Sequence, residues 1–546
     1  MDGPGAVLSP KTDTKFDYEK MKSLMKKIIA ISVLCLAAVT AGAQTMYDAL
    51  NYSDVNYYGT ARSAALGNAM TAVGADLGSV GINPAGSAVA GYSQFTITPG
   101  LSISSTSSTF APVAYGAIGT TTPDSQTRFI MPNLGFILNM DTRRDYGLKN
   151  FTFGMTINTT NVFNERMSAG GTNNDTSMMG EMAYFATGIP ASYISGSNAY
   201  QNTDYSWRDI LAFQSGMIST YGEGDDQYIG STELIFDDGT IGLGGPIKQS
   251  YYRQRTGSKS DALINMAFNW NDKFYFGGNI GVTSLNFTEN LNRSESAVNV
   301  NDFALILDDV ETAWKSGRER YTLETNGTGI YGKFGFIWLP TDGLRLGAAV
   351  KTPTLLTISE RWMWDAVCDF DGFNSNLCET PVGDYTYQLV SPFNFNLGAA
   401  YTLGNMALVS VDWERTDYRF MRFREEDRSF GSDVFSEDNN YIRQNAGVTN
   451  NFRFGFEFKP VEAFALRAGY SYKNYAEQSV KDLTHTASLG FGYSSPGSFF
   501  LDAAVRYTLL PDNWYYPYDD YLNVRSPEVC VTNQMMDVML TLGWRF

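Results

Sequence analysis

Short segments that alternate apolar and polar residues recur along this chain in pairs, and a tight turn joins each pair. Clear examples surround Asn271-Asp272, Thr341-Asp342-Gly343 and Gly404-Asn405. An alternation with period two gives a β-strand one apolar face and one mixed face. Long polar segments separate the pairs, and short turns alternating with long loops are typical of barrels that cross a bacterial outer membrane. The sequence therefore predicts an all-β fold, a transmembrane antiparallel β-barrel.

We expect fourteen strands, and an even number agrees with single-chain bacterial barrels. They lie near 92–104, 128–140, 149–160, 262–270, 274–287, 328–338, 344–352, 392–402, 406–416, 450–459, 464–474, 485–494, 498–508 and 535–546. With the amino-terminal segment inside, every short connection falls on the periplasmic side. The long connections are then extracellular loops, at 105–127, 161–261, 288–327, 353–391, 417–449, 475–484 and 509–534.

Charged residues share one face of these strands. Phe454 and Phe456 alternate with Arg453 and Glu457, and Asp502 has the parity of Arg506. Because charges are costly on the lipid face, these residues are assigned to the lumen. Several lumen positions are glycine, which either relieves barrel curvature or leaves room for an occupant of the interior. These positions are Gly154, Gly277, Gly281, Gly347, Gly398, Gly490 and Gly492.

The chain begins with an extension and a predicted secretory signal peptide over residues 1–43. Met25-Lys26-Lys27 opens a basic region, residues 28–38 are apolar, and Ala41-Gly42-Ala43 is an A-x-A cleavage site. The apolar run is too short for a membrane anchor. Cys35 could suggest a lipoprotein, but Leu34 stands where a small residue is needed. Residues 1–20 have no role in export and are left out of the fold prediction.

The last strand ends in an alternating pattern, with apolar residues at every second position. These residues are Val538, Leu540, Leu542, Trp544 and Phe546. A terminal aromatic on such a strand resembles the signal that the barrel-insertion machinery of the outer membrane reads. We therefore predict Trp544 and Phe546 as the membrane-insertion signal.

Composition excludes several classes of function. Without residues 1–43 the chain has 19 more acidic than basic residues, which argues against nucleic-acid binding. The single histidine, His485, has lipid-face parity, and the sequence gives no orienting partner for a Ser-His mechanism. No P-loop, H-E-x-x-H or Cys-x-x-Cys occurs. We predict no enzyme, no cofactor and no metal. The loop acidic clusters are either solvated charge or sites for calcium or lipopolysaccharide-bridging cations; they are Glu223-Gly224-Asp225-Asp226, Asp237-Asp238 and Asp519-Asp520.

Three cysteines remain after signal cleavage. Cys368 and Cys378 are ten positions apart in one predicted extracellular loop, and a disulfide could join them in an oxidising compartment. Cys530 is then left over as a buried or unpaired thiol.

Residues 44–91 do not alternate and are rich in Gly, Ala, Ser and Asn. They could form a flexible tail, but apolar anchors favour a compact plug, or hatch, inside the lumen of the barrel at 92–546. The anchors are Leu66, Met70, Val73, Leu77, Val80 and Ile82.

This segment contains the short motifs Gly59-Thr60-Ala61-Arg62, Gly67-Asn68-Ala69, Ala72, Asp76 and Asn83-Pro84-Ala85 with Gly86. These motifs resemble the hatch of the FadL/TodX family of outer-membrane transporters for hydrophobic compounds. The resemblance continues through the fourteen strands to the terminal Phe546. It implies passive uptake of long-chain fatty acids or aromatic hydrocarbons, with ligand capture at extracellular loops and a hatch that rearranges. Asn83 and Pro84 could serve this movement or form only a structural turn.

The long loop at 161–261 contains a predicted amphipathic helix, residues 207–221, and a second is expected at 303–314. Candidate ligand contacts are Trp207, Leu211, Phe213 and Ile218 in the first and Leu307 in the second. These residues could instead pack the loops over the barrel mouth, and no ligand residue of the family aligns with them.

Two alternatives to hydrophobic uptake stay open. A general porin for polar solutes would have an open, charged lumen, and a surface adhesion or structural barrel would use its loops. The expected partners are a hydrophobic small molecule, outer-membrane lipid and lipopolysaccharide, and the barrel-insertion machinery, with the protein a monomer.

Overall fold

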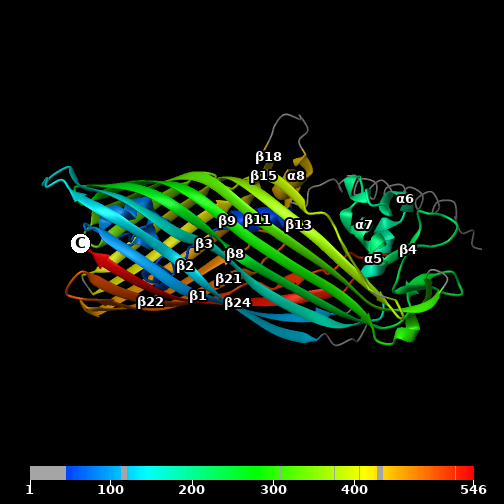
Figure 1. The fold of residues 1–546 in the computed structure, drawn as a ribbon. Coiled ribbons are helices and arrows are strands. Elements are labelled where there is room, and N and C mark those ends of the chain that lie inside the picture. Colours follow the sequence, from blue (N-terminus) through cyan, green and yellow to red (C-terminus); the bar gives the residue numbers. More distant parts are fainter. Residues whose placement is uncertain are drawn as a thin grey trace, which may run out of the picture.

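The structure is a computed structural model that describes residues 45–111, 120–202, 204–307, 310–373, 375–404, 406–426, 434–522 and 524–546. The predicted signal peptide lies outside the described residues. The chain forms a long β-barrel, with the C terminus at one end and a small helical region at the other (Figure 1).

Fourteen antiparallel strands close the barrel, as predicted. Closure occurs where β1 (Gln94–Ala111) pairs with β24 (Glu528–Arg545). Between them come β2 (Thr121–Asp141), β3 (Leu148–Asn173), β8 (Ile247–Trp270), β9 (Phe274–Ala297), β11 (Val310–Thr341), β12 (Leu344–Lys351) continued by β13 (Leu355–Phe370), β15 (Gly383–Val390) continued by β16 (Asn394–Leu403), β17 (Ala407–Asp417), β19 (Val448–Val461), β20 (Phe464–Asn474), β21 (Leu483–Ser494) and β22 (Phe499–Leu509).

Apolar and charged residues lie on opposite faces of the wall, as predicted. Phe454 and Phe456 point outward with about 40% of their surface exposed, whereas Arg453 and Glu457 are buried in the lumen. A belt of exposed apolar side chains surrounds the end of the barrel that holds the C terminus, and includes Met155, Ile264, Ile280, Phe334, Leu397, Leu466, Leu489 and Val538. Such a belt is what a barrel presents to lipid. His485 lies on this outer face, where its Nδ1 is 2.8 Å from the Tyr470 hydroxyl.

Several predicted loops are strands that extend beyond the apolar belt. β3 continues to Asn173, β8 begins at Ile247, and β13 and β15 occupy most of the predicted loop at 353–391. The helix expected at 303–314 is wrong: this segment comprises the end of η3 (Val300–Phe303), β10 (Ala304–Leu307) and the start of β11. Other elements outside the ring, besides those of the cap described next, are β14 (Asn376–Glu379), η4 (Tyr418–Phe420), β18 (Arg422–Glu425), α8 (Ser436–Asn445) and β23 (Asn513–Tyr515).

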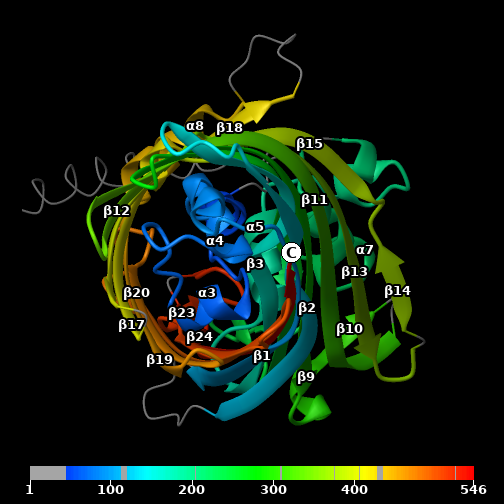
Figure 2. The same cartoon turned by 90° about the vertical axis from the view of Figure 1, so that its left-hand side faces the viewer.

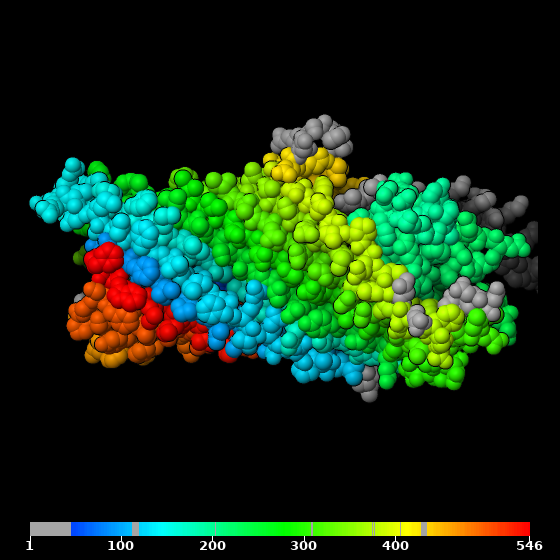
Figure 3. Space-filling view, viewed as in Figure 1, coloured from blue at the N-terminus to red at the C-terminus, as the bar shows by residue number. Residues whose placement is uncertain are grey.

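A cap, residues 174–246, covers the end of the barrel opposite the C terminus (Figure 3). It contains α5 (Met178–Ala186), α6 (Ala191–Ile194), η2 (Ala199–Gln201), α7 (Trp207–Gln214), β4 (Ile218–Thr220), β5 (Tyr228–Gly230), β6 (Glu233–Ile235) and β7 (Ile241–Leu243). The predicted helix at 207–221 therefore exists but ends at Gln214, and β4 follows it. No helix in the described ranges is both long and apolar enough to cross a membrane.

The expected disulfide between Cys368 and Cys378 is wrong. In the β13–β14 hairpin Cys368 pairs with Asn376, and Cys378 pairs with Ala366. The two cysteines are thus diagonal neighbours, whose Cα atoms in a sheet are about 7–8 Å apart, beyond the usual reach of a disulfide. Cys368 is a buried thiol, and the Cys378 thiol donates to the Gln214 carbonyl oxygen at 3.3 Å.

Residues 45–91 lie inside the ring of strands, and we call them the hatch (Figure 2). The hatch has four short helices, each begun by a side chain that accepts a backbone hydrogen bond. They are α2 (Met46–Ser53, capped by Thr45), α3 (Ala61–Ala65, by Thr60), α4 (Leu77–Val80, by Asp76) and η1 (Pro84–Val89, by Asn83).

Candidate functional site

Lumen glycines make room for the hatch. A Cβ atom on Gly347 would lie 2.2 Å from the Thr71 carbonyl oxygen, and one on Gly277 would lie 2.5 Å from the Pro84 carbonyl carbon. Gly398 and Gly490 face the hatch in the same way. Close backbone approach is a known use of glycine in strands. Four of the seven glycines noted in the sequence therefore leave space for an occupant, whereas Gly154, Gly281 and Gly492 approach other residues of the wall.

Asn83 joins the hatch to the wall. Its Nδ2 donates to three carbonyl oxygens, at 2.6 Å to Thr71 in the hatch, 3.1 Å to Phe336 in β11 and 3.4 Å to Ala348 in β12. Its Oδ1 accepts from the Ala85 amide, which starts η1. One side chain thus holds both the local turn and two strands of the wall.

The other predicted hatch residues have local contacts. Asp76 Oδ1 accepts from the Thr60 hydroxyl at 2.6 Å and from the Gly78 amide at 2.8 Å. Gly67 has a positive φ of 61° and lies against strand backbone, where a Cβ would be 3.0 Å from the Phe454 carbonyl oxygen. A Cβ on Gly86 would lie 2.8 Å from the Ser79 hydroxyl. Their part in any movement of the hatch stays a prediction.

Charged lumen residues hold the hatch from several sides. Asp412 accepts from the amide and hydroxyl of Thr71 at 2.8 and 2.6 Å. Arg62 pairs with Glu457 at 3.0 Å. Buried ion pairs cost desolvation and gain from good geometry, so their main effect here is to fix one position of the hatch.

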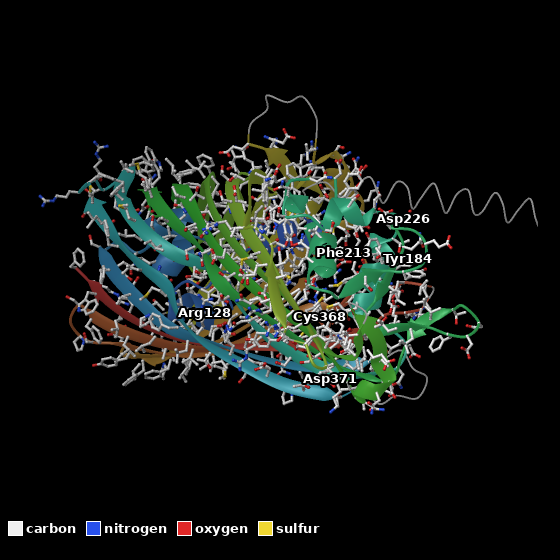
Figure 4. The ribbon with its side chains drawn as sticks, turned by 45° about the vertical axis from the view of Figure 1, so that its right-hand side comes forward. Arg128, Tyr184, Phe213, Asp226, Cys368 and Asp371 are labelled. Carbon is white, nitrogen blue, oxygen red and sulfur yellow. The ribbon has the colours of Figure 1, made fainter. Side chains whose placement is uncertain are left out.

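Backbone pairing between β2 and β3 covers only part of the two strands. The backbone ladder joins Asn133–Asp141 of β2 to Asn150–Asn158 of β3 and goes no further. Above it, side-chain contacts replace the ladder: Arg128 of β2 donates to the carbonyls of Phe163 in β3 and Gly257 in β8, at 3.2 and 3.3 Å. Arg128 lies on the wall well below the cap (Figure 4). We call this boundary, where no backbone ladder joins β2 to β3, the seam.

The hatch contacts β3 where the seam begins. The register of β3 against β8 shifts between Thr159 and Asn161. There, the backbone N–H of Asn56 in the hatch donates to the Thr160 carbonyl at 2.7 Å. The backbone N–H of Tyr58 donates to the Thr159 carbonyl at 3.2 Å. The bulge in β3 therefore directs backbone carbonyls into the lumen, where the hatch satisfies them.

A narrow cavity between hatch and wall lies at the same place and has room for about one water molecule. Hatch residues Val55, Tyr57, Tyr58, Gly59, Gly78 and Gly81 line one side, and Asn158, Thr159, Thr160, Asp261, Leu263, Tyr331, Lys333 and Lys351 line the other. Lys333 and Lys351 are not among the residues predicted from the sequence, although both stand at lumen positions of apolar strands, where a cation requires a partner.

Toward the cap, helix α2 fills an apolar chamber. Its residues Met46, Leu50 and Tyr52 pack with aromatic side chains of the wall and with Ile442 of α8, and all are buried. The chamber also includes Phe163, Phe287, Tyr387, Tyr418, Phe423 and Phe435. The hatch itself therefore occupies an aromatic surface inside the ring.

The predicted ligand contacts lie in the core of the cap. Leu211 and Ile218 are each 1% exposed, and Phe213 packs edge-to-face on Tyr228 at 5.8 Å (Figure 4). Trp207 lies against Trp362 of β13, with ring centroids 6.4 Å apart. The side chain of Leu307 lies outside the described residues. The other four residues pack the cap over the mouth of the barrel.

Buried charges connect the cap to the wall. Arg208 of α7 binds Glu181 of α5 at 3.0 Å and Glu319 of β11 at 2.8 Å. Beside them, burial raises the pKa of Asp209 to about 7, although the Arg208 charge opposes the rise. The cap is therefore held by a compact network that includes one carboxyl group able to titrate near neutral pH.

Comparisons by sequence find no match, either among protein-family models or among curated proteins. Among solved structures, a FadL homologue from Pseudomonas aeruginosa is 10% identical with a TM-score of 0.50, covering 90% of this chain and 99% of its own. This chain has the fold of that FadL homologue. The P. putida toluene transporter TodX matches at 13% identity over 90% of this chain and 99% of its own, with a TM-score of 0.47. The CymD monoaromatic hydrocarbon channel matches at 11% identity over 89% of this chain and 97% of its own, with a TM-score of 0.45.

Proposed function

We propose that this chain is a FadL-type channel of the bacterial outer membrane through which hydrophobic molecules enter passively. The fold and the apolar belt support membrane insertion, and the hatch motifs support membership of the FadL/TodX family. In this proposal, ligand is captured at the cap, the hatch rearranges, and ligand leaves sideways through the seam between β2 and β3.

One observation carries the proposal. Asn56 and Tyr58 of the hatch donate to the carbonyls of Thr160 and Thr159, where β3 leaves β2. A movement of the hatch that breaks these two bonds leaves buried carbonyls unsatisfied, which costs about 1–3 kcal/mol each and favours a rearrangement of β3. The state of the hatch is thus coupled to the state of the seam.

The seam also lies at the level of the apolar belt, where an exit would open toward lipid. Phe129 and Met131 of β2 and Ile157 of β3 point outward beside it and are 65%, 37% and 47% exposed. A molecule that leaves the cavity here meets lipid rather than water. Exit through the periplasmic end would have to pass the contacts of Asn83 and η1 with the wall.

A reversible crosslink tests the movement of the hatch. A Cβ on Gly455 of β19 would lie 3.2 Å from the Leu66 Cβ, near the separation of about 3.5–4.5 Å in a disulfide. We expect the double variant Leu66→Cys/Gly455→Cys to lose uptake of a labelled hydrophobic probe when oxidised and to regain it after reduction. Each single variant under the same oxidant is the control. Full uptake by the crosslinked protein would exclude a moving hatch.

A sugar uptake assay separates this proposal from the porin alternative. Liposomes with the intact protein should exclude a small sugar, because the hatch and the wall are in close contact. Free entry of the sugar would favour a porin and reduce the hatch to a structural plug.

A further inference from the structure

An open groove of about 820 Å³ lies on the outer face of the wall, near its capped end, and we call it the outer groove. Its floor consists of two rows of residues that pair across β3, β8, β9, β11 and β13, which run side by side along the wall (Figure 1). One row is Thr172, Lys248, Ser296, Ser316 and Asp369, and the other is Gly170, Ser250, Ser294, Arg318 and Val367. At the spacing of paired strands, each row is about 19 Å long.

The floor of the outer groove faces away from the lumen. The residues that alternate with it along the strands point inward and hold the cap. Glu295 accepts from the Met178 amide at 2.7 Å, and Glu319 binds Arg208 at 2.8 Å. Because successive residues of a strand point to opposite faces, the two rows lie on the outside. The outer groove is therefore separate from the hatch and from the candidate site.

Side-chain size gives the outer groove its shape. Six of the ten floor residues are Ser, Thr or Gly. The next positions in register toward the apolar belt include Tyr252 and Arg320, whose larger side chains border the floor. At the β3 edge, the Thr120 hydroxyl donates to the Gly170 carbonyl oxygen at 2.5 Å, so the start of β2 borders another side. Small residues between larger neighbours therefore produce the depression.

The floor offers hydrogen-bonding groups and little apolar surface. Within the part of the chain that the structure describes, the hydroxyls of Ser250, Ser294 and Ser296 have no hydrogen-bond partner. A hydroxyl both donates and accepts, as the hydroxyls of a sugar do. Val367 is the one apolar side chain of the two rows, whereas protein interfaces are enriched in aromatic residues and Met. The composition of the floor therefore favours a saccharide over a protein.

Two cations flank the serines of the floor. Lys248 belongs to no ion pair within 4.0 Å among the described residues. Arg318 Nη2 lies 3.8 Å from Asp365, and Arg318 Nε is buried without a hydrogen-bond partner in the same part of the chain. The carboxylate of the floor, Asp369, accepts from the Ser316 hydroxyl at 2.9 Å. The two cations are about 12 Å apart at the spacing of a sheet. An anionic ligand would therefore complement the floor.

The strands carry the outer groove well above the apolar belt. Ser294 follows Ile280 of the belt by fourteen residues along β9, which is about 46 Å of strand. A strand tilt of about 40° places the groove about 35 Å above the level of Ile280. The outward-facing residues of β9 just below the groove are all Ser, Thr or Asn, namely Ser284, Asn286, Thr288, Asn290 and Asn292. An uncharged hydrogen-bonding surface thus leads from the belt to the groove.

We infer that the outer groove binds the saccharide of lipopolysaccharide, at a segment that contains acidic sugars. Lys248 and Arg318 bind the carboxylates of these sugars, and the serines between them bind sugar hydroxyls. The inference uses the proposed outer-membrane location, in which the cap faces the cell exterior and the groove lies in the saccharide layer. It goes beyond uptake, because the groove holds lipopolysaccharide beside the barrel without using the lumen or the hatch.

Titration with a lipid-free saccharide tests the inference, because it removes the contribution of lipid contacts. The full chain in detergent micelles would be titrated with the saccharide that mild acid releases from a lipopolysaccharide whose O antigen contains uronic acid. We expect saturable binding that weakens about tenfold when the carboxyl groups of the saccharide are reduced to alcohols. A capsular polyuronate, titrated in parallel, presents the same carboxylates from a different source.

Variants assign the binding to the outer groove. Lys248→Met should lower the affinity for the acidic saccharide to that for the reduced saccharide. Ser294→Glu, which adds a carboxylate between the two cations, should abolish binding. The matched controls are Lys273→Met in an exposed turn and Asn326→Glu, which faces outward on β11 below the groove, and both should bind as wild type. A heat-dependent gel shift verifies that each variant is folded, and uptake of a hydrophobic probe into liposomes should be unchanged in all four.

Three results would overturn the inference. Equal affinity for the acidic and the reduced saccharide, or wild-type binding by Lys248→Met and Ser294→Glu, would exclude an anionic site in the outer groove. Binding of the capsular polyuronate without binding of the lipopolysaccharide saccharide would assign the groove to another glycan. No binding of any saccharide would leave the groove to a protein partner or to solvent. Each of these results leaves the proposed uptake intact, and failure of uptake by the wild type would leave a measured saccharide site intact.

Discussion

The side-chain amide of Asn83 in the hatch donates to the backbone carbonyl of Phe336 in β11 across 3.1 Å. The same amide reaches Thr71 and Ala348, so one residue connects the hatch to itself and to two strands. Asn83→Ala removes these bonds and leaves buried carbonyls unsatisfied, at a cost of about 1–3 kcal/mol.

We expect Asn83→Ala to loosen the hatch and give a small ion conductance in planar bilayers, where the wild type is closed. Asn286→Ala, which removes an exposed outward-facing asparagine, is the matched control. A variant as tightly closed as wild type would mean that the glycine-lined contacts hold the hatch without Asn83.

Steric pressure on the hatch gives a second prediction. A Cβ on Gly335 would lie 1.8 Å from Asn83 Oδ1 and 2.8 Å from Pro84 Cδ, whereas one on Gly332 of the same strand meets no atom closer than 3.8 Å. Gly335→Ala should therefore displace η1 and raise its hydrogen exchange, and Gly332→Ala should not. Equal exchange in both variants would contradict the close fit.

Deletion of residues 44–86 should open the lumen. The hatch fills the space between the lumen glycines, so assembled barrels without it should conduct ions and admit a small sugar. Conductance should be measured per assembled barrel and compared with wild type. No change in conductance would favour the adhesion or structural alternative, in which the interior has no role in transport.

The cap should respond to pH through Asp209. Burial raises the pKa of this group to about 7, so the folded cap binds a proton that the unfolded cap releases near pH 4. The stability of the cap should therefore fall as pH rises from about 4 to about 7 and then stay level. Hydrogen exchange of α7, corrected for the intrinsic rate, should show less protection at pH 8 than at pH 5. Asp209→Asn should remove most of this difference.

The sequence predicts the part of the barrel that contacts lipid. Every one of the fourteen strands has an apolar outer face there, as in Phe454 and Phe456, and period two is visible. Above the belt the outward-facing residues of β3, β8 and β9 are mostly polar, so the apolar outer face disappears although the strands continue. Segments such as 161–173 and 247–261 were predicted as loops for this reason, and the helix expected at 303–314 was wrong because short apolar runs do not separate strand from helix.

Only part of the candidate site can be predicted from the sequence. The hatch and its Asn83-Pro84-Ala85 turn are readable from composition and motif. The seam and the lysine pair are not, because they depend on which strands stop pairing and on which positions face each other across β11 and β12. Lys333 and Lys351 are separated by eighteen positions in the chain and become neighbours only through the register of the hairpin.

The order of the chain adds a consequence for assembly. Ser93, just after the hatch, exchanges two backbone hydrogen bonds with Phe546 at the end of β24. The strand that leaves the hatch is therefore the strand that completes the ring. The hatch lies inside the ring and is joined to the wall on several sides, by Arg62, Thr71 and Asn83. We therefore expect the wall to close around the hatch during assembly, so that the lumen is already blocked when the barrel is complete.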